Sequence, residues 1–244
     1  MSAYRFLSVM NQPQNRLWPD GPFYRAAGFP ISTDSILLSA FARIQGTQRC
    51  VDLGCGAGLL LVLLGSRCPK AELTGIELQP DIAEAARQNL TVNGHHAKII
   101  TGDLRQHRAL LPAGQYDLVV ANPPYFPVGS GAAAGNPVRA AARSEADCTL
   151  SQLCTAAAWL CRTGGAFCLV HKPERLSELC VCLTQSGLEP KRLRFVCSKV
   201  GAAPSLILME GRRGARPGLV IHPPLVLTKD DGTETDELRA IYHK

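Results

Sequence analysis

The sequence lacks any apolar run long enough to cross a membrane. Its most apolar stretches, residues 36–42 and 59–64, are far shorter than the roughly 20 residues that a spanning helix requires. It also lacks the apolar N-terminal stretch of a secretory signal peptide. We therefore expect a cytoplasmic protein with no membrane partner.

The spacing typical of metal ligands is absent as well. The chain has 10 cysteines, but no two of them form a Cys-x-x-Cys pair, and Cys180 and Cys182 are only two positions apart. His95 and His96 are neighbours, which would point in different directions on any regular element. We expect no bound metal. Because several cysteines lie inside apolar runs, we also expect free thiols rather than disulfides.

Neither charge nor hydrophobicity is extreme in this chain of 244 residues. Hydrophobic residues make up 46% and charged residues 19%, which is typical of a globular protein with a sizeable core. The net charge of +6 is compatible with an anionic partner such as RNA without requiring one. Residues 1–30 mix prolines, aromatics and arginines. We expect them to pack as an extension on a domain at 31–244, rather than to stack single-stranded nucleic acid.

Apolar runs of strand and helix character alternate along this domain. They predict an α/β fold whose seven-stranded, mostly parallel, Rossmann-like sheet ends in an antiparallel hairpin. The expected strands are 50–53, 71–76, 98–101, 116–121, 166–170, 188–197 and 205–210, and the expected helices are 36–42, 59–66, 80–92, 151–161 and 174–186. The tail after residue 222 is expected to form a strand, a tight turn and a short helix.

A glycine-rich turn follows the first expected strand. Gly54, Gly56 and Gly58 allow the backbone to approach a ligand closely, at the N-terminus of the following helix. The dinucleotide-binding fingerprint would require glycine at the position of Leu59. A site for NAD is therefore disfavoured.

Acidic residues flank this turn. Asp52 precedes it, and Glu77 ends the second strand, where a carboxylate can accept both hydroxyls of a ribose. This Asp-x-Gly-x-Gly-x-Gly pattern, with an acid closing the next strand, resembles the S-adenosylmethionine site of class I methyltransferases. The resemblance implies that Asp103, after the third strand, meets the adenine amine of the cofactor, and that Leu78 and Leu104 contact the same cofactor. Capping of a helix is the alternative role for Asp103.

The strand expected at 116–121 ends abruptly in Asn122-Pro123-Pro124-Tyr125. Proline removes a backbone donor and keeps the residue before it extended, so the Asn122 side-chain oxygen and the Pro123 carbonyl can point the same way. Two acceptors suit a planar amine with two N–H donors, such as adenine N6 or a carboxamide, and Tyr125 can cover its flat face. Parallel strands share one carboxyl edge, so cofactor and amine would meet there. A plain strand ending is the alternative.

This tetrapeptide resembles that of amino methyltransferases acting on adenine N6, glutamine or guanine N2. Further segments are similar to the bacterial tRNA adenine-N6 methyltransferase family, which modifies the adenosine beside the anticodon of a valine tRNA; they are residues 29–38, 142–145, 198–199 and 231–237. The resemblance implies methyl transfer to adenine N6 in structured RNA, with tRNA as the expected substrate, and adds Asp34 and Asn122 to the cofactor contacts. Glutamine methylation of a translation factor, guanine-N2 methylation of rRNA and a non-catalytic RNA-binding module are the alternatives.

Basic residues near these motifs are candidate contacts to RNA, and no DNA partner is expected. Two arginines lie in an insertion that can close over a substrate, for which a plain surface loop is the alternative. Three more basic residues lie on or after an expected strand, where such charges also serve to blunt a solvated edge. The candidate RNA contacts are Phe126, Arg139, Arg143, Arg192, Arg194 and Lys199.

Overall fold

The computed structural model describes residues 15–28, 31–123 and 148–243. Its centre is an eight-stranded sheet with the strand order β10-β8-β9-β7-β6-β3-β4-β5. Neighbouring strands pair in parallel, except that β9 runs antiparallel to both β7 and β8. The strands are β3 (Arg49–Leu53), β4 (Glu72–Glu77), β5 (Ala97–Thr101), β6 (Tyr116–Ala121), β7 (Cys161–His171), β8 (Leu188–Cys197), β9 (Pro204–Arg213) and β10 (Val220–Val226).

The α/β class, the mostly parallel sheet and the antiparallel hairpin of β8 and β9 are confirmed, but the strand count of seven is wrong. The eighth strand is β10, which pairs in parallel with β8 at the edge of the sheet. Pro223 and Pro224 lack backbone donors, and the register of the pairing shifts between His222 and Leu225. A segment without regular alternation therefore still extends the sheet.

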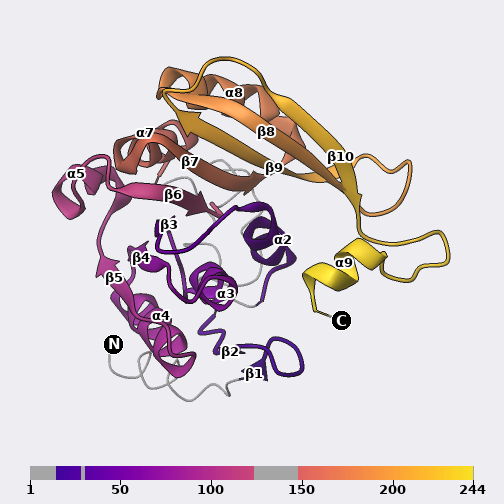
Figure 1. Cartoon of the computed structure of the whole chain (residues 1–244), viewed down its shortest axis with the longest axis horizontal. Helices are drawn as coiled ribbons and strands as arrows, with labels where there is room; N and C mark the ends of the chain where they lie inside the picture. The colour runs from indigo at the N-terminus through magenta and orange to yellow at the C-terminus, as the bar shows by residue number, and fades with distance from the viewer. Residues whose placement is uncertain (1–14, 29–30, 124–147, 244) are drawn as a thin grey trace.

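Helices cover both faces of the sheet (Figure 1). One face carries α2 (Thr33–Phe41), α3 (Leu59–Arg67), α4 (Pro80–Val92) and α9 (Asp236–Ile241). The other carries α5 (His107–Leu110), α7 (Leu150–Leu160) and α8 (Leu176–Gln185), with the short 3-10 helices η1 (Leu104–Gln106) and η2 (Pro173–Arg175) before α5 and α8. This double cover explains the continuous apolar run of β6. Val120 joins the core on the first face, and Val119 joins the core on the second.

Gly164 and Gly165, before the expected strand 166–170, indicate a turn in the sequence, but they lie inside β7. A Cβ on Gly165 would lie 2.9 Å from the carbonyl oxygen of Tyr116, so only glycine lets β7 approach β6 this closely. The register of the β6–β7 pairing shifts nearby, between Tyr116 and Leu118. Gly164 and Gly165 thus mark an irregularity in a strand rather than its beginning.

The described part of the N-terminal segment, residues 15–28, is here called the strap. It contains the short antiparallel strands β1 (Asn15–Arg16) and β2 (Phe23–Tyr24) and lies against α4 (Figure 1). Asn93 exchanges two hydrogen bonds of 2.8 Å with the backbone of Phe23. Asn89 does the same with Arg25, at 2.8 and 2.9 Å. Asn89 of α4 and Asn93, the C-cap of this helix, therefore bind the strap as a neighbouring strand would.

The cysteines are free, and eight of the ten are buried, as expected from the sequence. Across residues 15–28, 31–123 and 148–243, no helix has the length and apolar character needed to cross a membrane. Within the same ranges, no group of three or more His, Cys, Asp or Glu side chains could hold a metal ion.

Candidate active site

The carboxyl ends of β3, β4, β5 and β6 bring several predicted site residues to one edge of the sheet. The glycine turn follows β3, Glu77 ends β4, Asp103 lies two residues after β5, and Asn122 follows β6 directly. These four strands are neighbours in the order β6-β3-β4-β5. In open α/β sheets this edge is where ligands bind.

The glycine turn keeps a space open at this edge. The amides of Gly54 and Cys55 both donate to the carbonyl oxygen of Ile76, each at 2.9 Å, which fixes the turn beside β4. Gly54, Gly56 and Gly58 have φ values of 76°, 53° and 82°, which other residues adopt only with strain. A Cβ on Gly54 would meet nothing within 4 Å, so the turn borders open space here.

The third glycine of the turn also allows close helix packing. A Cβ on Gly58 would lie 3.2 Å from the Cβ of Ala86, so glycine lets the start of α3 pack closely against α4. Asn89, which is fully buried in α4, donates to the carbonyl oxygen of Ala57 at 2.9 Å. Packing and a buried hydrogen bond therefore hold this end of the turn.

Two buried acids lie behind the turn. Glu77 is 6% exposed, and its carboxylate accepts from the backbone amides of Gly56 at 3.0 Å and Gln79 at 2.9 Å. Burial raises its pKa despite these bonds. Asp52 is 2% exposed, and burial followed by the charge of Glu77 raises its pKa to about 8. Each Glu77 oxygen that accepts one amide retains a lone pair for another donor, such as a ribose hydroxyl.

Asp103 has the capping role that we gave as its alternative. It is the N-cap of η1, and its carboxylate accepts from the backbone amide of Arg105 at 2.9 Å. The same carboxylate forms an ion pair of 2.5 Å with the Arg105 guanidinium, and the hydrogen bonds from Arg105 lower its pKa. Leu104 is half-buried beside it, whereas Leu78 is 45% exposed beyond Glu77.

Asn122 is half-buried and faces the start of α2. Its side-chain nitrogen donates to the hydroxyl of Ser35 at 3.0 Å and to that of Ser32 at 3.5 Å. Asp34 lies between these serines in the chain, in the first turn of α2. Pro123 is also half-buried at the end of β6. Pro124, Tyr125, Phe126, Arg139 and Arg143 lie outside the described residues.

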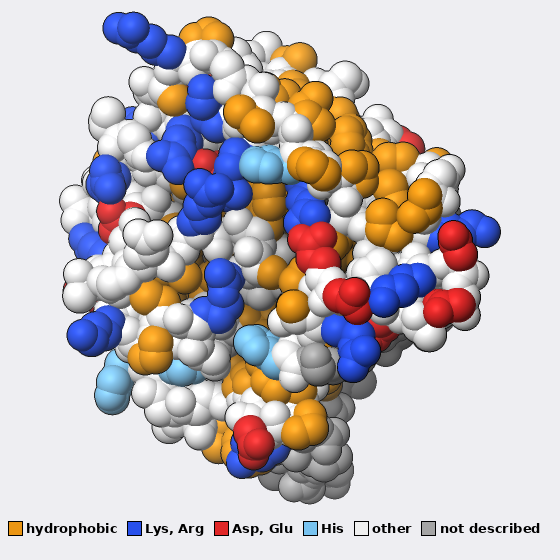
Figure 2. Space-filling view, turned by 45° about the vertical axis from the view of Figure 1, so that its right-hand side comes forward, with side chains coloured by type: hydrophobic (Ala, Val, Ile, Leu, Met, Phe, Trp, Pro, Cys, Tyr) orange, Lys and Arg blue, Asp and Glu red, His pale blue; other side chains and the backbone are white. Residues whose placement is uncertain are grey.

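The basic residues of β8 are engaged in protein contacts. Arg192 forms an ion pair of 2.5 Å with Glu210, which is 1% exposed, and donates to the carbonyl oxygen of Phe41 at 2.9 Å. Arg194 binds both carboxylate oxygens of Glu237, at 2.7 and 2.8 Å. Lys199 is exposed in the turn after β8. Figure 2 shows basic and acidic side chains interspersed on one face rather than a continuous basic strip.

Sequence reasoning missed the contacts of Ser32, Ser35 and Asn89. Ser32-Thr33-Asp34-Ser35, before the apolar run 36–42, indicate only a helix start with side-chain caps. Asn89 carries no expectation. The hydrogen bond from Asn122 to Ser35 spans 87 positions, and that from Asn89 to Ala57 spans 32. No local pattern reports such pairs.

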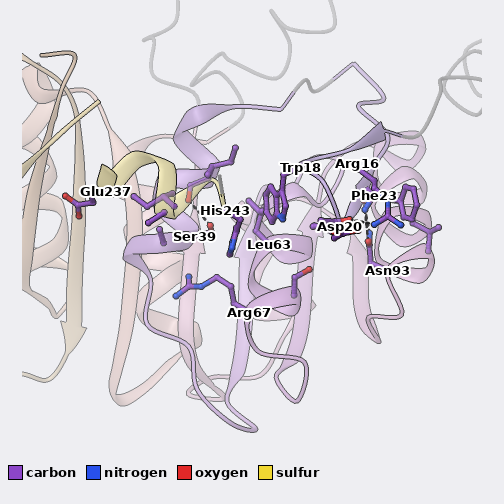
Figure 3. A pocket seen from close by; sticks show the side chains of 18 residues that line it. Arg16, Trp18, Asp20, Phe23, Ser39, Leu63, Arg67, Asn93, Glu237 and His243 are labelled. Carbon is purple, nitrogen blue, oxygen red and sulfur yellow. Dashed lines mark hydrogen bonds between the residues drawn. The ribbon is translucent and has the colours of Figure 1, made fainter. Parts of the chain in front are cut away.

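A separate hollow lies away from this edge (Figure 3). It has a volume of about 740 Å³ and lies between the strap, α2, α3 and α9, with Trp18, Ser39, Leu63, Arg67 and His243 among its lining residues. Trp18 and His243 stack there, with ring centroids 4.7 Å apart. None of the predicted site residues lines it, so it is distinct from the candidate active site.

The glycine turn beside open space, the acid closing the next strand and the polar residue ending β6 share one edge of a mostly parallel sheet. This fold and site define the class I S-adenosylmethionine-dependent methyltransferases. Residues 30–179 match the family model described as methyltransferase small domain, and the chain belongs to this family.

Individual proteins give a narrower comparison. The chain is 34% identical over 190 residues to a tRNA1(Val) (adenine(37)-N6)-methyltransferase of Shewanella amazonensis, covering 77% of this chain and 79% of that protein. It is 32% identical over 190 residues to the protein of the same name from Porphyromonas gingivalis, covering 75% and 74%. Its fold is similar to that of a predicted O-methyltransferase from Agrobacterium tumefaciens, with a TM-score of 0.71, 20% identity, and coverage of 86% and 96%.

Proposed function

We propose that this protein transfers a methyl group from S-adenosylmethionine to the N6 amine of an adenine in tRNA. The observation that carries the proposal is the position of Asn122 directly after β6, on the edge that also carries the glycine turn. The curated relatives named for adenine-N6 methylation of a tRNA support the choice of nucleotide and RNA. Such a reaction would take place in the cytoplasm.

The chain's own residues fit this cofactor. The open space beside Gly54 admits a ligand, and Glu77 at the end of β4 has acceptor capacity for ribose hydroxyls. We assign Asp52, Gly56, Gly58, Leu78, Leu104 and Asp34 to the same cofactor site, with Asp103 facing the adenine. When bound, S-adenosylmethionine supplies an electrophilic methyl carbon.

The chemistry then depends on holding the target amine. An adenine amine is a poor nucleophile because its lone pair is delocalised into the ring. The side-chain oxygen of Asn122 and the carbonyl oxygen of Pro123 accept its two hydrogens and shift electron density back to the nitrogen. Pro124 fixes the backbone after these acceptors, and Tyr125 stacks on the base. Positioning supplies much of the remaining rate, so no strong general base is required.

The RNA must reach this edge of the sheet. We assign Phe126, Arg139, Arg143 and Lys199 to RNA contacts, since basic side chains on phosphates fix the register of a nucleic acid. Arg192 and Arg194 are weaker candidates for RNA contacts, because their guanidinium groups bind Glu210 and Glu237, respectively.

Labelled methyl transfer tests the proposal. Purified protein and labelled S-adenosylmethionine are incubated with total tRNA, rRNA and protein from cells lacking the gene, followed by nucleoside mass analysis. We expect N6-methyladenosine in tRNA, and we expect Asn122→Ala to lower the rate by about 100-fold or more. Label in protein would indicate glutamine methylation instead, and N2-methylguanosine in rRNA would indicate the guanine reaction.

A further inference from the structure

The amide of Asn122 can function in only one of its two orientations. A target amine presents two N–H donors, so it needs the oxygen of the Asn122 side chain and is repelled by the amide nitrogen, which carries only donors. The nitrogen and oxygen differ by a half-turn about one soft torsion. A reaction that depends on this amide therefore requires a contact that distinguishes its two ends.

The start of α2 supplies such a contact. Ser35 is 7% exposed, and its hydroxyl oxygen accepts from the Asn122 side-chain nitrogen at 3.0 Å. Because the carboxamide is planar, fixing the nitrogen against α2 directs the oxygen to the other side of the group.

Ser32 gives this contact its polarity. Its hydroxyl donates to the Ser35 oxygen at 3.0 Å, and its oxygen accepts from the Ser35 backbone amide at 3.2 Å as the N-cap of α2. The Asn122 nitrogen now lies 3.5 Å from the Ser32 oxygen. Because the Ser32 proton is already donated to Ser35, a reversed amide would place the Asn122 oxygen, an acceptor, against the Ser32 oxygen, which is also an acceptor. The Ser35 hydroxyl can donate as well as accept, so it fixes the position of the amide, while the Ser32 oxygen distinguishes the two ends of the amide.

We propose that Ser35 is a positioning residue that holds the Asn122 amide with its oxygen toward the methyl acceptor. This inference rests on the proposed function, because it gives the orientation of Asn122 a catalytic meaning. Ser35 acts through Asn122 and need not touch the substrate. The sequence shows only a helix cap at this position, since the partner lies 87 residues away.

Ser39 provides a matched control on the same helix. It lies one turn beyond Ser35, is 4% exposed, and donates to the carbonyl oxygen of Ile36 at 2.7 Å, without a hydrogen bond to Asn122. Ser35→Ala and Ser39→Ala each remove one buried hydroxyl from α2. A purely structural role predicts the same consequences for both substitutions.

The test compares kcat on tRNA, the affinity for S-adenosylhomocysteine by calorimetry, and thermal stability. We expect Ser35→Ala to lower kcat by about 10-fold, the equivalent of one lost hydrogen bond, and to leave the affinity within about twofold. Ser39→Ala should keep kcat within about twofold at a similar melting temperature, and Ser35→Thr, which retains the hydroxyl, should recover most of the activity. Equal kcat values for Ser35→Ala and Ser39→Ala would overturn the inference.

A readout independent of turnover follows the amide itself. The two side-chain protons of Asn122 are assigned in a nitrogen-15 NMR spectrum by their loss in Asn122→Ala. Ser35→Ala should shift one of them and speed its exchange with solvent, whereas Ser39→Ala should not. The proposed function and this inference fail separately: an active Asn122→Ala contradicts the former, while an inactive Asn122→Ala with a fully active Ser35→Ala contradicts only the latter.

Discussion

Asp52 makes the cofactor-free protein sensitive to pH. Burial and the nearby Glu77 raise its pKa from the ordinary value of 3.8 to about 8. Between about pH 4 and pH 8 the folded chain therefore holds a proton that the unfolded chain has released. The free energy of unfolding must fall as the pH rises through this window, because the unfolded state binds fewer protons there.

Asp52→Asn should remove this contribution, since an amide does not ionise. We expect the free energy of unfolding of the wild type, relative to Asp52→Asn, to fall by up to about 1.4 kcal/mol per pH unit between pH 5 and pH 7.5. Urea unfolding of both cofactor-free proteins at the two pH values measures this difference. Titrating groups that do not interact with Asp52, such as His171, act in both proteins and cancel. A difference that does not change with pH would mean that Asp52 is ionised throughout.

Two glycines of the turn can be assigned different roles by one substitution. Gly54 and Gly58 have φ values of 76° and 82°, so alanine costs about 1–2 kcal/mol at either position. Only Gly58→Ala adds a contact of 3.2 Å with Ala86. We expect Gly58→Ala to lower the melting temperature more than Gly54→Ala does. For the same loss of melting temperature, Gly54→Ala should weaken the binding of S-adenosylhomocysteine more. Fluorimetry and calorimetry on both variants measure this, and the opposite ranking would contradict the assignment.

At the scale of single residues, the sequence predicts the position of those residues whose placement depends on the neighbouring sequence. Gly54, Glu77 and Asn122 stand at strand ends, and strand ends can be recognised from the apolar runs before them. Ser35 and Asn89 could not be assigned because their partners are brought close only by packing of helices on the sheet. Asp103 shows a third case, since a cap and a ligand contact have the same local pattern.

Among the elements, α4 links the strap to the glycine turn. Asn89 binds both Arg25 of the strap and Ala57 of the turn, whereas Asn93 binds Phe23 of the strap and the backbone of its own helix. Figure 3 shows Asn93 beside Phe23. The strap and the turn therefore share one buried side chain.

Asn89→Ala and Asn93→Ala should differ in their effect on the cofactor. Both substitutions loosen the strap, which we expect to speed tryptic cleavage after Arg25. Only Asn89→Ala leaves the Ala57 carbonyl oxygen without this donor, so only this variant should bind S-adenosylhomocysteine several-fold more weakly in calorimetry. Equal losses of affinity in the two variants would show that the strap alone, rather than the bond to the turn, determines the effect.

A buried carboxylate forms ion pairs with arginines in β8 and β9. Glu210 is 1% exposed and forms ion pairs with Arg192 and Arg212, and despite its burial these arginines hold its pKa below the usual value. Arg192→Ala should cost about 2 kcal/mol or more in urea unfolding, because one cation of a buried cluster is lost. Arg194→Ala, whose partner Glu237 has a half-exposed side chain, should cost less than about 1 kcal/mol. Similar losses of unfolding free energy in the two variants would show that the buried ion pair contributes no more to stability than the exposed one.

The elements themselves were largely predictable, and the exceptions have physical causes. The bounds of β3, β4 and β6 were predicted nearly correctly from apolar runs, because a parallel sheet buries both sides of such strands. The beginning of β7 was misplaced because Gly164 and Gly165 look like a turn, although they serve a close approach to β6. The strand expected after residue 222 corresponds to β10, although the count of seven strands left it out. Its prolines are tolerated because one side of an edge strand is not paired.

At the scale of the whole molecule, one edge of the sheet collects the chemistry, and the distribution of charge determines how RNA can reach it. The net charge is +6, yet several arginines form ion pairs with acidic side chains of the protein itself. Lys199 follows the carboxyl end of β8, and β8 runs in the same direction as β6 and β7. It therefore lies on the same edge as Asn122.

The salt dependence of tRNA binding should distinguish these two groups of cations. A side chain that contacts phosphate releases counterions, so its removal reduces the slope of log affinity against log salt by about one. We expect Lys199→Ala to do so in filter-binding titrations over a range of salt concentrations. Arg192→Ala should lower the melting temperature but leave the slope unchanged, since its guanidinium binds Glu210 and the carbonyl oxygen of Phe41. If Arg192→Ala reduced the slope and Lys199→Ala did not, the RNA would approach along β8 rather than across the carboxyl edge, and the phosphate contacts would have to be reassigned to that strand.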